Sequence, residues 1–305
     1  MTFRSKKQHA LLQPREAKQH HRTAELLRFA ALCTFFAAAA PCRADLNVLP
    51  QGSRAAALGN IGVVNADVFA AYNNQAALGF LASPAAMVHY QNSYFSEALG
   101  LSAAAVAVPV PVAGVAAVDL CSFGYSQYRE TRMGVGLGKQ LSGRVAVGAQ
   151  VCYHHISVAG YGSTGAVTAE LGLLAEPLKG LWVGAHVFNF TGSRYFSPQY
   201  HERLPVMFDL GLSYRVAQYA LLLADAKLDS DKPVQVRAGA ELHVVKSLAL
   251  RFGVQVKPVE LFAGFGYAYK QLQVDVAFSR HEVMGYSPQI SLCYSFKSKR
   301  RNAEL

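Results

Sequence analysis

Cys152, His154 and His155 are the closest group of residues in the sequence that could bind a metal. Residues two apart lie on the same face of a strand, so Cys152 and His154 could supply two zinc ligands. Structural zinc sites use four ligands, and no third or fourth ligand lies nearby in sequence. We therefore predict no metal and no cofactor. Outside the N-terminal leader the cysteines are Cys121, Cys152 and Cys293, and we expect them to be small apolar side chains that face lipid or core.

Two further patterns in the sequence do not match those of enzymes. A hydrolase needs a nucleophile, a base and an orienting group, and the sequence has no Gly-x-Ser-x-Gly motif. Gly134, Gly136 and Gly138 are spaced by two and open no helix, unlike the glycines of a phosphate-binding loop. On one strand face such glycines instead leave room for a segment that packs against the strand. We predict that the protein is not an enzyme.

Charged side chains form a third set, and they share one face of several strand-like segments. Enclosed charges require partners. These residues therefore line a polar passage, or they hold an N-terminal segment in place through Arg54 or Asp67. The set is Asp225, Lys227, Arg237, Glu241, Arg251 and Asp275.

The elements that carry these residues are about fourteen segments, each long enough to cross a bilayer as a tilted strand. In 247–257, for example, Leu250, Phe252 and Val254 alternate with Arg251 and Gln255. We predict an all-β protein: a transmembrane antiparallel β-barrel over residues 84–296 in the bacterial outer membrane, with its apolar face toward lipid. The segments are 84–95, 98–109, 112–127, 131–141, 143–156, 164–176, 179–190, 205–216, 218–229, 233–244, 247–257, 259–270, 271–280 and 287–296.

A membrane helix is the alternative for residues 98–118, which contain no charge. Pro109 and Pro111 would interrupt that helix, and Pro-Val-Pro suits a turn between strands. The short links at 141–143, 217–218 and 257–258 are predicted periplasmic turns, and those at 157–163 and 191–204 are predicted extracellular loops. The second loop is a candidate recognition surface through Arg194, Tyr195, Phe196, Tyr200, His201 and Arg203.

The two ends of the chain carry most of the net charge of +10. Residues 1–44 read as a signal peptide, with basic residues before an apolar run and cleavage after Ala44; lipidation of Cys42 is the alternative. Residues 297–305 form a basic C-terminal tail. Because the body between these ends is nearly neutral, we predict no binding to nucleic acid.

Residues 45–83 are expected to form a compact plug inside the barrel. Small residues and glycines dominate its centre, which allows close packing and tight turns. The candidate motif consists of Gly52, Arg54, Gly59, Gly62, Asp67, Tyr72, Asn73, Asn74, Ala76 and Leu78.

This motif resembles the N-terminal signature of the PorV/PorQ family of outer-membrane barrels, with Gln75 where that family usually has proline. The resemblance implies a role near type IX secretion or cell-surface attachment, with secretion-system proteins or exported substrates as partners. Because that family is related in fold to FadL-type transporters, the alternative is a channel for a hydrophobic ligand such as a fatty acid. A structural or assembly role is the third reading. Outer-membrane lipid is an expected partner in each case.

Overall fold

The computed structural model describes residues 51–196 and 203–296. The predicted signal peptide 1–44, the first residues of the predicted plug, the tail 297–305, and Tyr200 and His201 of the candidate recognition loop lie outside the described residues.

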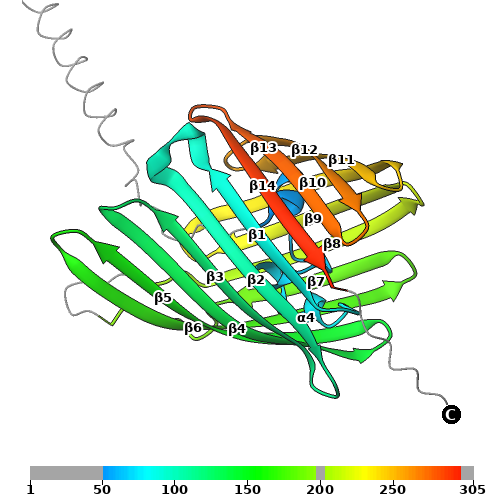
Figure 1. The fold of residues 1–305 in the computed structure, drawn as a ribbon, viewed down its shortest axis with the longest axis horizontal. Coiled ribbons are helices and arrows are strands. Elements are labelled where there is room, and N and C mark those ends of the chain that lie inside the picture. The colour runs from blue at the N-terminus through cyan, green and yellow to red at the C-terminus, as the bar shows by residue number, and fades with distance from the viewer. Residues whose placement is uncertain (1–50, 197–202, 297–305) are drawn as a thin grey trace, which may run out of the picture. The chain divides into compact units, whose positions relative to one another are not determined.

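Fourteen antiparallel strands form a closed barrel, in which β1 pairs with both β2 and β14 (Figure 1). This confirms the predicted fold class and strand number, and every predicted segment overlaps one strand. The strands are β1 (Ala85–Asn92), β2 (Gly100–Val110), β3 (Gly114–Gly124), β4 (Tyr128–Ser142), β5 (Val145–Val158), β6 (Gly162–Leu178), β7 (Leu181–Phe188), β8 (Met207–Ala217), β9 (Ala220–Asp229), β10 (Lys232–Val245), β11 (Leu248–Val256), β12 (Glu260–Tyr269), β13 (Leu272–His281) and β14 (Gly285–Ser295).

The uncharged stretch 98–118 forms the hairpin of β2 and β3, so the helical alternative is wrong. Pro109 lies near the end of β2, and Pro111 begins the turn. Within the part of the chain that the structure describes, no helix is long and apolar enough to cross a membrane.

The two faces of the wall differ as predicted. On β11, Leu250, Phe252 and Val254 are exposed on the outer face, whereas Arg251 and Gln255 are buried on the inner face. Exposed apolar side chains outside and buried charges inside reverse the pattern of a soluble protein. A closed barrel with this pattern is the architecture of a bacterial outer-membrane protein.

The links at the two ends of the barrel differ in length. At the end where β1 begins and β14 ends, every link has two or three residues. The other end carries the 18-residue link 189–206 and the link between β1 and β2, with helices η1 (Ser93–Phe95) and η2 (Glu97–Leu99). Since outer-membrane barrels have short periplasmic turns and longer extracellular loops, the first end is periplasmic.

The turn at Lys257–Pro258 was assigned to the wrong end. It joins β11 to β12 and therefore lies at the extracellular end, with the links 159–161 and 189–206. The turns at 142–144 and 217–219 are periplasmic as predicted. Short turns look alike at both ends, and only the number of preceding strands distinguishes them.

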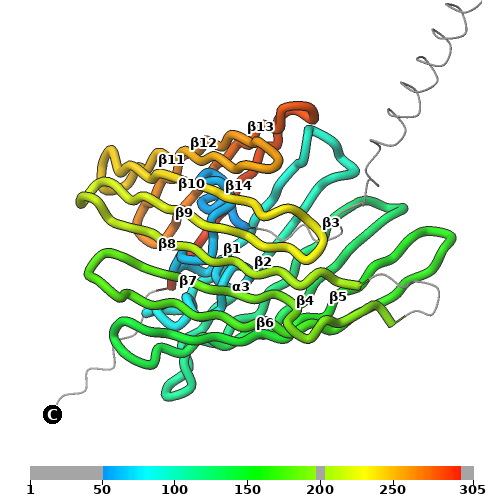
Figure 2. Tube along the Cα trace, turned by 180° about the vertical axis from the view of Figure 1, so that it is seen from behind, coloured from blue at the N-terminus to red at the C-terminus, as the bar shows by residue number. Residues whose placement is uncertain are grey.

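The N-terminal segment forms three short helices, α2 (Ser53–Ala57), α3 (Ala70–Asn73) and α4 (Gln75–Leu78). Helix α2 contacts β11 to β14, and α4 contacts β3 to β6, on the opposite side of the barrel. The segment therefore crosses the lumen, where its helices appear in blue within the ring of strands (Figures 1 and 2). Its apolar residues join the inner wall in one buried core. We call residues 51–83 the plug segment.

Candidate functional site in the barrel lumen

Arg54 of α2 reaches the inner wall on the side of β10 to β13. Its Nε and Nη2 donate to the two carboxylate oxygens of Glu241, over 3.0 and 3.1 Å. Its Nη1 also lies 3.5 Å from Asp67 of the plug segment. Burial raises the pKa of the Asp67 carboxyl above its ordinary value, and Arg54 only partly opposes that shift. The plug segment thus contributes one cation and one anion to this group.

Arg251 extends the same group along the wall. Its Nε donates to Glu241 over 2.7 Å, and its Nη1 donates to Asp275 over 2.6 Å. Glu241 therefore binds two guanidinium groups, one from the plug segment and one from the wall. Glu241, Arg251 and Asp275 are three of the six predicted lumen charges. They lie together beside Arg54, which the sequence suggested as a partner.

Two other predicted charges meet on the neighbouring strands β9 and β10. Arg237 binds Asp225 through Nε and Nη2, over 2.6 and 2.7 Å. It also donates to Asp209, over 3.0 Å. Lys227, the last predicted charge, pairs with Asp209 in the strand register and faces the same lumen. Asp209 was not among the predicted residues.

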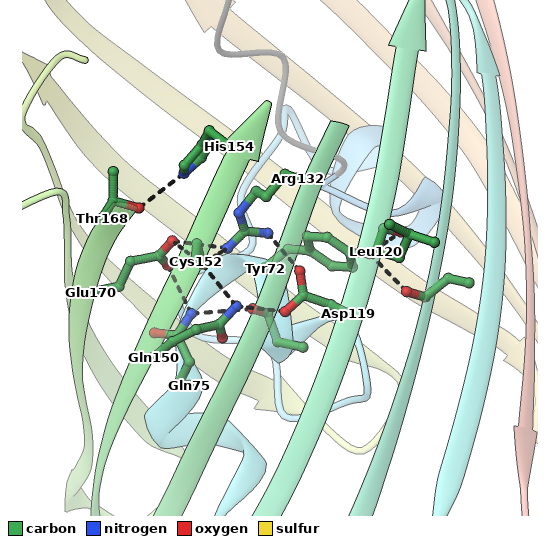
Figure 3. A network of polar contacts seen from close by, with 12 residues as sticks. Tyr72, Gln75, Asp119, Leu120, Arg132, Gln150, Cys152, His154, Thr168 and Glu170 are labelled. Atoms are coloured by element: carbon green, nitrogen blue, oxygen red, sulfur yellow. Dashed lines mark hydrogen bonds and ion pairs between the residues drawn. The ribbon is translucent and has the colours of Figure 1, made fainter. Parts of the chain in front are cut away.

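A third charged group, on β3 to β7, was not predicted (Figure 3). Arg132 donates to Asp119 over 2.9 Å and to Glu170 over 2.8 Å, and all three side chains are buried. The Arg132 guanidinium also lies over the Tyr72 ring, 5.1 Å from its centroid. Gln75 Nε2 of the plug segment donates to Glu170 over 2.9 Å.

Cys152 belongs to this third group and corrects the expectation of an apolar environment. Its sulfur lies 3.1 Å from Arg132 Nη2 and 3.2 Å from Glu170 Oε1. Cys121 and Cys293, by contrast, pack with the apolar core. His154 turns to Thr168 instead of joining Cys152, and no group of three or more potential metal ligands occurs in residues 51–196 and 203–296.

Side chains of the plug segment also bind the backbone of the wall. The Tyr72 hydroxyl lies 2.9 Å from the Ala104 carbonyl and 2.8 Å from that of Leu120, on β2 and β3. Asn74 Nδ2 donates to the Leu173 carbonyl of β6 over 3.0 Å. Asn74 Oδ1 accepts from Ala76 N and caps α4. Tyr72 and Asn74 of the motif therefore connect the plug segment to β2, β3 and β6, on the side of the barrel that α4 contacts.

Glycines of the inner wall let the plug backbone approach the strands closely. A Cβ at Gly239 would lie 2.6 Å from Leu58 O, and one at Gly184 would lie 2.5 Å from Val63 O. Gly138, Gly148, Gly172 and Gly253 would likewise collide with the plug segment. Of the three glycines noted on β4, Gly138 faces the plug segment, whereas Gly134 and Gly136 make room for the side chains of Asp119 and Gln150.

The remaining motif residues shape the plug segment itself. Gly52 and Gly59 have positive φ angles of 84° and 80°, which favour glycine. A Cβ at Gly62 would collide with the Asn73 side chain, whose Nδ2 donates to Gln51 O. Ala76 and Leu78 are completely buried in α4.

Two small polar cavities lie between the plug segment and the wall. One, of about 180 Å³, is near the periplasmic end and is lined by Arg54, Glu241, His243, Lys246 and Arg251, among others. The other, of about 10 Å³, lies between Tyr72, Asn73 and strands β7 to β10, and has room for about one water molecule.

The candidate recognition loop is only partly exposed. Tyr195 is buried, while Phe196 is exposed and its N–H donates to Gly165 O of β6 over 2.9 Å. Arg194 and Arg203 form a backbone bridge across the loop. Asn189 fixes its base, since its Nδ2 donates to Leu204 O and its Oδ1 accepts from Ser193 N.

No known protein family and no curated protein matches the sequence. Solved structures do match the fold. A Pseudomonas aeruginosa FadL homologue has a TM-score of 0.58 and 12% identity, over 81% of this chain and 98% of its own. The P. putida toluene transporter TodX has a TM-score of 0.62 and 12% identity, and the match covers 81% of this chain and 99% of TodX. The CymD monoaromatic hydrocarbon channel has a TM-score of 0.61 and 13% identity, over 81% and 98%.

At this level of identity the likeness establishes a FadL-like barrel fold. Two of these solved barrels are described as a toluene transporter and a monoaromatic hydrocarbon channel.

Proposed function

We propose that the protein is a FadL-like outer-membrane channel for hydrophobic small molecules. The observation that carries the proposal is the FadL-like fold over about four fifths of the chain, shared with a toluene transporter and a monoaromatic hydrocarbon channel. This reading takes precedence over the PorV/PorQ reading because it rests on most of the chain rather than on one short motif.

The inner wall carries a group of apolar side chains on one side of the barrel. Leu101, Ile156, Ala166 and Phe188 are buried on the inner faces of β2, β5, β6 and β7, on the extracellular side of the Arg132 group. The plug segment and the three charged groups lie below them, so a molecule that enters from outside meets the plug segment. We expect passage to require a shift of the plug segment.

Uptake by whole cells tests this function. The full chain is expressed in a host strain that lacks its own hydrocarbon and fatty-acid channels, and uptake of radiolabelled toluene and oleate is measured. We expect faster uptake of at least one of these two probes than in cells with an empty vector. Phe188→Asp should remove most of the gain, whereas Phe196→Asp, on an exposed loop, should preserve it. Unchanged uptake with the wild-type chain would refute the proposal.

Docking of secretion proteins, as in the PorV/PorQ family, is the second candidate. It is favoured by one observation: Arg54, Tyr72 and Asn74 of the resembling motif are the residues that attach the plug segment to the wall. Purification from the native outer membrane in mild detergent, followed by mass spectrometry, distinguishes the two. Stoichiometric secretion substrates or surface-anchoring proteins would support docking, and a bound apolar molecule without a protein partner would support the channel.

A further inference from the structure

The two ends of the barrel differ strongly in charge. Among the described residues within three residues of the periplasmic strand ends, seven side chains are basic and two are acidic. The basic residues are Lys139, Arg144, Lys179, Arg215, Lys246, Arg251 and Lys270, and the acidic residues are Glu176 and Asp275. By the same criterion, the described residues of the extracellular end include five basic and seven acidic ones. These are Arg129, Lys227, Lys232, Lys257 and Arg280, with Glu97, Glu130, Asp209, Asp229, Asp231, Glu260 and Glu282.

Four of the periplasmic basic residues form what we call the basic collar: Lys139, Arg144, Lys179 and Lys270. All four are exposed, and three occupy turns, each in a different one of the six periplasmic turns. Lys246 and Arg251 are not included because both line the lumen cavity beside Arg54. Arg215 is not included because it lies on the inner face of β8, where Ser213 and Gly211 precede it. The nearby carboxylate of Glu176 is engaged with the adjacent turn, because its Oε1 accepts a hydrogen bond from the Gly180 N–H. This hydrogen bond competes with an ion pair between Glu176 and a collar residue.

The collar is continuous with the lipid-facing surface. Lys139 follows Val135 and Leu137 on the outer face of β4. The Lys270 ammonium lies 5.0 Å from the centroid of the Tyr269 ring, which is exposed on the outer face of β12. Aromatic rings and long basic side chains at the end of an apolar band occupy the headgroup level of a bilayer.

We propose that the basic collar binds the phosphate groups of anionic phospholipids in the periplasmic leaflet of the outer membrane. Basic residues beside an anionic lipid surface attract its headgroups, and several of them act together. An acidic soluble protein would contact the turns alone. The position of Lys139 on the lipid-facing side and the stacking of Lys270 on Tyr269 favour a lipid instead. This site is independent of the transported molecule.

Native mass spectrometry of the delipidated, full-chain barrel tests the proposal, with phosphatidylglycerol or phosphatidylcholine added back in detergent. The collar variant combines Lys139→Gln, Arg144→Gln, Lys179→Gln and Lys270→Gln. The matched control removes four extracellular charges through Arg129→Gln, Lys232→Gln, Lys257→Gln and Arg280→Gln. A heat-dependent shift in electrophoretic mobility verifies that each variant is folded.

We expect the wild-type barrel and the control to bind phosphatidylglycerol more tightly than phosphatidylcholine, and the collar variant to lose at least tenfold in phosphatidylglycerol affinity. An unchanged affinity in the collar variant, or an equal loss in the control, would overturn the proposal. So would a wild-type barrel that shows no preference for phosphatidylglycerol but retains an acidic periplasmic protein through the collar.

Discussion

Arg54 and Glu241 are 187 residues apart in sequence, and the Arg54 guanidinium binds both oxygens of the Glu241 carboxylate. The pair joins the plug segment to the wall at one side of the lumen. Because Arg251 binds the same carboxylate, removal of Glu241 leaves two cations without their shared partner.

We expect Glu241→Gln to destabilise the folded barrel by about 3 kcal/mol, because breaking a buried ion pair leaves an uncompensated charge. Arg54→Ala should cost less, about 1–3 kcal/mol, since its side chain is partly exposed and Glu241 keeps Arg251. The double variant should show a coupling of about 1–2 kcal/mol between the two sites. Urea unfolding in detergent measures these values. Arg129→Ala, an exposed extracellular change, is the control. A comparable loss of stability in this variant would show that the loss is not specific to the Arg54–Glu241 pair.

The wall glycines give a second prediction. Gly239→Ala should destabilise the packing of the plug segment against the wall by about 1–3 kcal/mol, because the added methyl would collide with the Leu58 carbonyl. Gly143→Ala is the matched control, since nothing lies within 4 Å of a Cβ at this turn position. Limited proteolysis of the plug segment and urea unfolding report the difference. Equal stability of the two variants would show that the close approach at Gly239 is not needed.

Much of this arrangement was visible in the sequence, and the missing part has a physical cause. The alternation of Val254 and Gln255 predicts a wall with two different faces, and the need of Glu241 for a partner pointed to Arg54. The group of Asp119, Arg132 and Glu170 escaped because each lies on a different strand. Asp119 has Ala117 and Cys121 beside it on its strand face, and Glu170 has Thr168 and Gly172, so neither strand alone shows a charged partner. Only the strand register brings the three together.

Gln75 allows a third prediction, because the PorV/PorQ family usually has proline at this position. Gln75 is the first residue of α4, where proline is well tolerated, and Asn74 before it is extended, as a residue before proline prefers. Gln75→Pro and Gln75→Ala both remove the hydrogen bond to Glu170, at a cost of about 1–3 kcal/mol. We expect the two variants to unfold at similar urea concentrations. A proline variant less stable than the alanine variant by more than about 2 kcal/mol would mean that the turn cannot accept the family residue.

A disulfide between the plug segment and the barrel wall tests whether transport requires motion of the plug segment. The Ser291 hydroxyl of β14 donates to that of Ser53 in α2 over 2.8 Å, so a cysteine pair at these positions can cross-link the plug segment to the wall. Ser53→Cys and Ser291→Cys are combined with Cys293→Ala, which removes the neighbouring native thiol. Oxidised cells should lose most uptake of toluene or oleate, and a reductant should restore it. The single variants, oxidised in the same way, control for the serine substitutions. Full uptake through a cross-linked barrel would mean that the substrate passes beside a fixed plug segment.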